Sequence, residues 1–213
     1  MKVGILGTGD VGRALGNGFI ALGHEVMMGS RTAGGEKAKA WVNEAGDKAG
    51  EGTFEDATKF GEIVVLATLG SATEAVIAQV GADNFNGKLV LDAANPLDFS
   101  TGAPQLAIVG HDSLGERVQK AVPGAHVVKC FNTVGNPLMF KPELPGGPPT
   151  MFIAGNDDGA KAKTTELLKD FGWETADIGG IDGSRYLEAM CLAWVRYGVK
   201  TGGWMHAFKL LKK

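Results

Sequence analysis

The sequence predicts an α/β domain built around a doubly wound parallel sheet. Short apolar runs alternate along the chain with segments of helical spacing, which is typical of right-handed strand–helix–strand crossovers. The apolar runs are continuous, as expected of strands that helices cover on both faces. A chain of 213 residues with 44% hydrophobic residues can bury one sizeable core. We therefore expect one nucleotide-binding domain over residues 1–213, in which residues 181–213 form a small helical C-terminal extension.

The first half of the chain alternates regularly. Val3–Leu6 is a short apolar run that ends in glycine, as buried strands often do. Ser71 can cap a helix over Ala72–Val80, because Glu74 stands where a capping box needs an acid. Lys48–Phe54 is weaker and allows only a short edge strand. The other predicted elements of this half are a helix at Asp10–Leu22, a strand at Glu25–Met28, a helix at Glu36–Ala45 and strands at Ile63–Ala67 and Leu89–Leu91.

The second half continues the alternation less regularly, around a loop rich in proline and glycine at Pro142–Pro149. Tyr186–Tyr197 has helical spacing, and its apolar stripe extends to Trp204 and Phe208. A short extension cannot bury so much apolar surface alone, so a symmetric homodimer would cover it. Packing onto the parent sheet is the alternative. The remaining predicted elements are a helix at Leu114–Val122, strands at His126–Phe131 and Met151–Ala154, and a helix at Asp158–Phe171; the stripe residues are Leu187, Met190, Cys191, Trp194 and Val195.

Composition excludes several classes of partner. A net charge of −3 gives no basic field for nucleic acid or an anionic membrane surface. Cys130 and Cys191 have no metal-ligand or disulfide spacing, so we expect reduced buried thiols and no metal site. The N-terminus opens directly into a strand pattern, and no apolar stretch is long enough to span a bilayer. We therefore expect a cytoplasmic protein with no membrane segment.

A glycine pattern follows the first predicted strand. Gly7, Gly9 and Gly12 form Gly-x-Gly-x-x-Gly between a strand and a helix, which is the context that the Rossmann dinucleotide-binding motif needs. The first glycine makes the tight turn, the second lets the backbone approach the pyrophosphate, and the third lets the helix pack closely on the strand. Free N–H groups at the helix start attract the phosphates. The alternative is a glycine-rich turn that binds nothing.

The end of the second strand favours NADP over NAD. An NAD-binding unit usually has an Asp or Glu there, which bonds the ribose 2′-hydroxyl. This chain has Ser30, Arg31 and Thr32 instead, and Lys37 follows closely. A carboxylate would repel a 2′-phosphate, whereas hydroxyls and a guanidinium bind it. Ser30 and Thr32 can also cap the next helix, which is compatible with phosphate binding.

Polar side chains and backbone groups follow the later strands, where ligands bind in open α/β sheets. None of them is an obvious acid or base, and hydride transfer between two bound rings needs alignment rather than a proton donor. We therefore expect no catalytic side chain, including at the histidines, of which His24 and His126 flank strands and His111-Asp112-Ser113 cannot form a triad from adjacent residues. The expected cofactor-binding residues of this edge are Ala67, Thr68, Leu69, Ala94, Asn95, Pro96, Asn132 and Thr133.

These motifs resemble those of the NADPH-dependent coenzyme F-420 reductase family, whose members pass hydride between NADP(H) and a 5-deazaflavin. The matching segments are residues 7–12, 22–26, 29–31, 92–98, 129–133, 170–173 and 207–209. The resemblance covers nearly the whole chain, and its later motifs indicate a bacterial subgroup of dinucleotide-binding proteins. It implies that Thr8, Gly9, Asp10 and Val11 line the pyrophosphate, and that Ser30 and Arg31 hold the 2′-phosphate. The family's lysine comes sooner after the Ser-Arg pair than Lys37 does here.

Three functions stay open. The leading one is an NADP(H)-dependent oxidoreductase that transfers hydride directly to or from a small-molecule, flavin-like acceptor, such as a 5-deazaflavin or a flavin. The second is a reductase of a small carbonyl or imine, which commonly needs a larger helical substrate domain than the roughly 80 residues left after the sheet provide. The third is a non-enzymatic NADP(H) sensor, since its phosphate loop would be identical.

Overall fold

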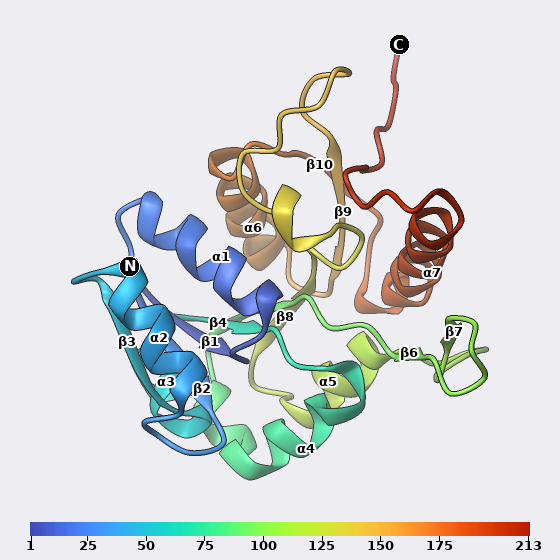
Figure 1. Ribbon diagram of the computed structural model, residues 1–213. Helices are drawn as coiled ribbons and strands as arrows, with labels where there is room; N and C mark the ends of the chain where they lie inside the picture. Colours follow the sequence, from blue (N-terminus) through green and yellow to red (C-terminus); the bar gives the residue numbers. More distant parts are fainter.

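The computed structural model describes residues 1–213 and has a central eight-stranded sheet with helices on both faces (Figure 1). Six neighbouring strands are parallel, in the order β3–β2–β1–β4–β5–β8. This is the order 3-2-1-4-5-6 of a doubly wound dinucleotide-binding sheet, so the predicted fold class is confirmed. Strand order reverses between β1 and β4, which opens a crevice at their carboxyl ends. These strands are β1 (Lys2–Leu6), β2 (Glu25–Ser30), β3 (Ala49–Thr53), β4 (Ile63–Leu66), β5 (Leu89–Asp92) and β8 (His126–Lys129).

The sheet is not parallel throughout, contrary to the prediction. β9 (Thr150–Gly155) runs antiparallel to β8, and β10 (Glu174–Asp177) is parallel to β9. The connection from β8 to β9 has only a 3₁₀ turn, η2 (Asn136–Leu138), and a parallel return would need a longer crossover, usually a helix. The sequence did not predict β10, which has no run of apolar residues and forms by pairing with β9.

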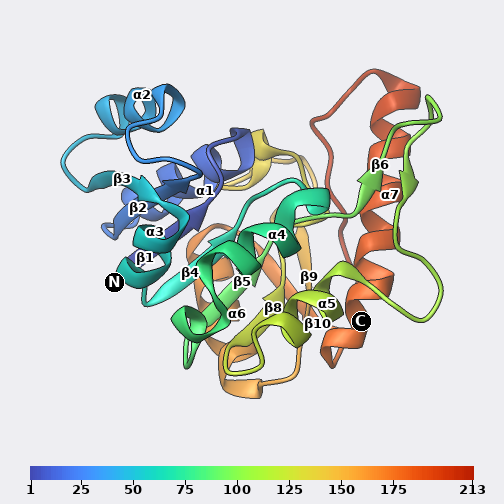
Figure 2. The ribbon, with the colours of Figure 1, turned by 90° about the horizontal axis from the view of Figure 1, so that it is seen from below.

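Helices cover both faces of the sheet (Figure 2), and an apolar cluster lies on each face. One packs under α1 (Asp10–Ala21), α2 (Glu36–Ala45) and α6 (Asp158–Asp170). The other packs under α3 (Phe54–Phe60), α4 (Gly70–Val80) and α5 (Leu114–Ala121). The sequence missed α3, which starts with a capping box between Thr53 and Asp56. The predicted Ser71 cap is wrong: α4 begins at Gly70, its N-cap residue is Leu69, and no side chain caps it.

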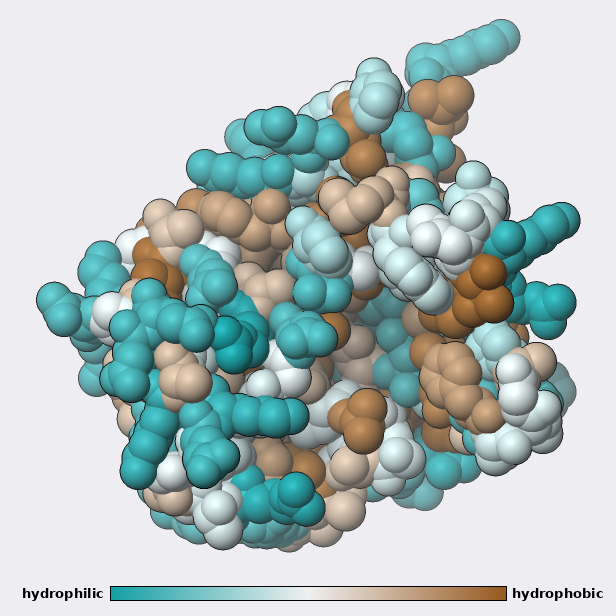
Figure 3. Space-filling view, viewed as in Figure 1, coloured by the Kyte–Doolittle hydropathy of each residue, from teal (hydrophilic) through white to brown (hydrophobic).

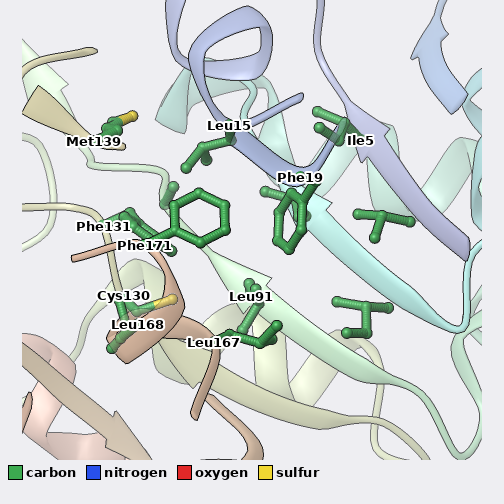
Figure 4. Close-up of a cluster of buried hydrophobic side chains, with 14 of the residues drawn as sticks. Ile5, Leu15, Phe19, Leu91, Cys130, Phe131, Met139, Leu167, Leu168 and Phe171 are labelled. Atoms are coloured by element: carbon green, nitrogen blue, oxygen red, sulfur yellow. The ribbon is translucent and has the colours of Figure 1, made fainter. Parts of the chain in front are cut away.

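The first cluster contains a group of phenylalanine rings (Figure 4). Phe171 packs edge-on against Phe19 with ring centroids 4.8 Å apart, and its centroid lies 5.4 Å from that of Phe131. Phe131 holds a left-handed backbone conformation, with φ of 57°, directly after Cys130. Such a conformation costs energy in a residue other than glycine and is kept only where packing fixes it. Burial raises the pKa of the Cys130 thiol, which stays protonated.

The C-terminal helix α7 (Ser184–Thr201) lies beside a small hairpin of β6 (Leu97–Asp98) and β7 (Gln105–Leu106) (Figures 1 and 2). Much of the predicted apolar stripe is buried within the chain, including Leu187 and Trp194. These side chains are therefore covered within one chain, and Trp194 packs with Cys191 and Val195 in a small cluster of its own, beside Leu97 and Phe208. The outer side keeps Tyr186, Tyr197 and Trp204 exposed. No helix, α7 included, has the length and apolar character needed to cross a membrane.

Candidate functional site

The glycine loop connects β1 to α1, and each glycine has a distinct steric reason. Gly7 has φ of +130°, and a Cβ there would lie 2.3 Å from the carbonyl oxygen of Ala67. A Cβ on Gly12 would lie 2.3 Å from the carbonyl oxygen of Gly7, whereas one on Gly9 would meet nothing within 4 Å. Gly7 and Gly12 are thus required by packing, and Gly9 leaves open space at the N-terminus of α1. That space is a cradle that fits a pyrophosphate.

A pocket of about 310 Å³ lies next to this loop, between the end of β2 and the start of α2. Five of the predicted residues line it together, and the other lining residues include the acidic Glu36. Arg31 and Lys37 form no ion pair within the chain, so both cations can bind an anion. The Ser30 hydroxyl donates to the carbonyl oxygen of Thr32 at 2.7 Å and must turn to donate to a phosphate. The predicted lining residues are Thr8, Ser30, Arg31, Thr32 and Lys37.

Two further residues hold the turn after β2, and sequence reasoning missed both. Glu51 on β3 accepts a hydrogen bond from the backbone N–H of Gly34 at 2.8 Å. The ammonium of Lys39 lies 3.3 Å from where a Cβ on Gly34 would be, so it reaches back over the same turn. Lys39 follows Lys37 by two residues on α2, and residues at that spacing face different sides of a helix, so no signal in the sequence indicated this placement.

The loops after β4, β5 and β8 meet at the carboxyl edge of the sheet. A Cβ on Gly70 would lie 2.0 Å from the carbonyl oxygen of Asn95, so the first two loops touch. Asn95 Nδ2 donates to the backbone oxygen of Asn132 at 2.9 Å, and Asn132 Nδ2 donates to Asn95 Oδ1 at 3.0 Å. This reciprocal pair joins the second and third loops. The predicted residues of this edge therefore lie together.

These residues differ in what they expose. Leu69 exposes 79% of its surface, and Ala67, Thr68 and Asn95 are half-buried. Thr68 is fixed by a hydroxyl contact of 2.8 Å with Thr73. The side chains of the other four predicted residues are buried, so they shape the loops from beneath rather than face a ligand; these are Ala94, Pro96, Asn132 and Thr133. The Oδ1 of Asn132 is itself buried and has no hydrogen-bond partner.

The loops border a hollow in the surface of this face (Figure 3, in the view of Figure 1). The elements around α1 and α2 lie on one side of it, and those around α7 and the β6–β7 hairpin lie on the other. Phe99, which follows β6, exposes 56% of its surface. Leu69 and Phe99 are thus exposed apolar side chains in the loops after β4 and β6.

A cluster of buried charges lies at the ends of the two strands that carry the second and third loops. Asp92, Lys129 and Glu188 are all buried, and the ammonium of Lys129 lies 2.9 Å from Asp92 Oδ2 and 3.0 Å from Glu188 Oε1. Burial alone would lower the pKa of Lys129, but the two carboxylates outweigh it and raise the pKa, so the amine stays charged. The sequence signal was a charged residue that ends each of two apolar strands.

The four histidines lie in different places, and three are away from this edge. His24 and His126 stand at the amino ends of β2 and β8, and His111 is exposed on a loop. Burial, with the nearby N-terminal amine, lowers the pKa of His24. His206 is the exception, because its ring stacks on Trp194 at 4.6 Å, and the Trp194 ring lies against Gly135 in the connection after β8.

Comparison with known proteins identifies the family. The model of the coenzyme F-420-dependent NADP oxidoreductases matches residues 2–96, from β1 to the loop after β5. A crystal structure of an Arthrobacter sp. FB24 protein, assigned as an F-420-dependent NADP reductase, superimposes with a TM-score of 0.93, at 38% identity over 100% of both chains. The F-420-dependent NADP reductase of Methanothermobacter thermautotrophicus is 26% identical over 213 residues, which are 94% of this chain and 90% of that protein.

A third relative is a larger protein. Metalloreductase STEAP3 of Rattus norvegicus is 28% identical over 197 residues, which are 90% of this chain. The chain spans only 36% of the length of STEAP3. The full-length match to the Arthrobacter structure and the family model over the nucleotide half agree with the geometry of the glycine loop. The chain belongs to the coenzyme F-420-dependent NADP oxidoreductases and is an NADP-dependent oxidoreductase.

Proposed function

We propose that the protein transfers hydride directly between NADP(H) and a flat, flavin-like acceptor, and that this acceptor is a 5-deazaflavin such as F-420. The observation that carries the proposal is the continuity of the site. The cradle at Gly9 stands between a pocket with unpaired cations and a carboxyl edge with an exposed leucine. The names of two relatives, both F-420-dependent NADP reductases, support the choice of acceptor.

In this proposal, different loops bind different parts of the dinucleotide. Gly7, Thr8, Gly9 and the start of α1 hold the pyrophosphate through backbone N–H groups, and Arg31 holds the 2′-phosphate together with Ser30, Thr32 and Lys37. The nicotinamide lies at the carboxyl edge near Thr68, Leu69 and Asn95, where NADPH supplies the hydride. The chain's own contribution is to align the two rings and exclude water, because no acid–base pair is needed.

Isotope transfer tests the direct mechanism. With NADPH deuterated on one face of C4, we expect the label to pass to the acceptor carbon from that face only, because a fixed ring presents one hydrogen. Mass spectrometry follows the label in reduced F-420, whose accepting carbon does not exchange its hydrogen with water. FMN and FAD accept hydride at an exchanging nitrogen, so they are compared by turnover alone. Loss of the label from F-420 to water would contradict direct transfer. Binding of NADPH without turnover of any acceptor would favour the sensor instead.

His206→Ala is the matched control for acid–base chemistry, since His206 lies nearest to the connection after β8. We expect less than about a tenfold loss of turnover, below the usual contribution of a general acid or base. A loss of several orders of magnitude with NADPH binding intact would point to a substrate that needs protonation, such as a carbonyl or an imine.

We also propose that the protein works as a homodimer in the cytoplasm. The exposed side chains on the outer side of the extension, Tyr186, Tyr197 and Trp204, support a self-complementary contact, and both cysteines are free thiols. Light scattering at micromolar concentration is expected to give twice the mass of 22.2 kDa. A monomeric mass would contradict the dimer.

A further inference from the structure

The buried charges described above connect the two strands that frame the ring site. Asp92 is the last residue of β5, Lys129 is the last residue of β8, and the two are partners in the register of the sheet. The Lys129 ammonium donates to Asp92 Oδ2 at 2.9 Å and to the carbonyl oxygen of Ala94 at 2.6 Å, and it contacts Glu188 Oε1 at 3.0 Å. An ammonium has three protons, so each has an acceptor. Asp92 Oδ1 in turn accepts the N–H of Ala94 at 3.0 Å, which fixes the loop before Asn95.

Glu188 brings α7 into the same cluster. Its carboxylate accepts the backbone N–H groups of Leu114 at 3.1 Å and Gly115 at 3.0 Å, at the N-terminus of α5. The preceding residue of α7, Leu187, accepts a hydrogen bond at its carbonyl oxygen from Asn132 Nδ2 at 2.9 Å. Two consecutive residues of α7 therefore hold the cluster and the Asn132 loop.

Burying three charges brings little stability, because an ion pair inside a protein barely repays its desolvation and an apolar core of the same shape often serves as well. Geometry is what this arrangement supplies: each charge has fixed partners, and each partner is on a different element. We infer that Lys129, Asp92 and Glu188 are positioning residues that hold the loops of Asn95 and Asn132, and with them the seat of the nicotinamide ring, against α7. This inference rests on the proposed NADP(H) site.

Glu188→Gln tests it, because the substitution keeps the shape but places an NH₂ group among N–H and ammonium donors. The matched control is Glu116→Gln, which breaks a half-buried pair between Glu116 of α5 and Arg185 of α7 without touching the strand ends. The first readout is amide hydrogen exchange of the unliganded protein. We expect about tenfold faster exchange at residues 93–95 and 130–134 in Glu188→Gln, as for the loss of a hydrogen bond to a charged group, and no change there in Glu116→Gln.

The second readout is calorimetry with NADPH and with 2′,5′-ADP, which lacks the nicotinamide. The comparison distinguishes binding of the nicotinamide ring from binding of the phosphates. Glu188→Gln is expected to lower the affinity for NADPH by about threefold to tenfold, as for one lost contact. The affinity for 2′,5′-ADP should change by less than about twofold. Equal losses for both ligands, or unchanged exchange in the two loops, would overturn the inference. If the unaltered protein binds no NADPH, the proposed function fails, and the exchange comparison alone decides the role of the cluster.

Discussion

Gly9→Val is expected to abolish dinucleotide binding while the fold persists. A Cβ at Gly9 meets no protein atom within 4 Å, and the backbone there, at φ −79° and ψ −178°, is one that valine adopts readily. The branched side chain instead fills the space that the pyrophosphate must enter. We expect at least about a hundredfold loss of NADPH affinity by calorimetry, the size of several lost hydrogen bonds to charged oxygens.

Gly12→Ala is the steric control for this experiment. Its Cβ would lie 2.3 Å from the carbonyl oxygen of Gly7, so the substitution should lower the melting temperature in circular dichroism, which Gly9→Val should leave nearly unchanged. NADPH binding that survives Gly9→Val at full strength would show that the loop is only a turn between β1 and α1.

Arg31→Ala is expected to remove most of the preference for NADPH over NADH. We expect the unaltered protein to bind NADPH about tenfold or more tightly than NADH, because NADH lacks the 2′-phosphate that we propose Arg31 binds. The variant should bind NADH as before, since Arg31 has no ion-pair partner in the chain.

Arg196→Ala controls for the change in net charge, because Arg196 is an exposed cation on α7, outside the pocket that Arg31 lines. It should leave the ratio of the two affinities unchanged. Equal affinities for NADPH and NADH in the unaltered protein would refute the assignment of the 2′-phosphate to this pocket.

The parts of the fold that follow from local sequence were predictable. The β1–α1 loop is one example, because Gly7, Gly9 and Gly12 are close in sequence, and packing requires Gly7 and Gly12 while Gly9 leaves open space. Five residues of the pocket beside it were also expected, since the end of a strand and the next helix are adjacent in sequence. Ser71 shows the limit of such reasoning. The capping pattern predicts that the helix begins after Ser71, but α4 begins at Gly70, where the backbone lies against the carbonyl oxygen of Asn95.

Features that depend on distant pairing were not predictable. The direction of β9 depends on the path by which an irregular connection returns to β8. β10 forms only by pairing with β9. The charged cluster joins Asp92 and Lys129 across 37 residues of chain, and its third member comes from α7. A charged residue ends each of the two apolar strands, but nothing in the separate segments indicates which charges meet inside the protein.

The reversal of β9 also determines which part of the chain lies beyond the carboxyl edge of the parallel strands. Because Lys129 pairs with Ala154, the first residues of β9 project past the carboxyl edge, where Thr150 donates its N–H to the carbonyl oxygen of Phe208 at 2.9 Å. The connection before β9 and the C-terminal tail make up this part of the chain beyond the carboxyl edge. Neither segment belongs to residues 2–96. Doubling the length of such a flexible loop costs only about 0.6 kcal/mol of closure entropy. Insertions there would leave residues 2–96 unchanged.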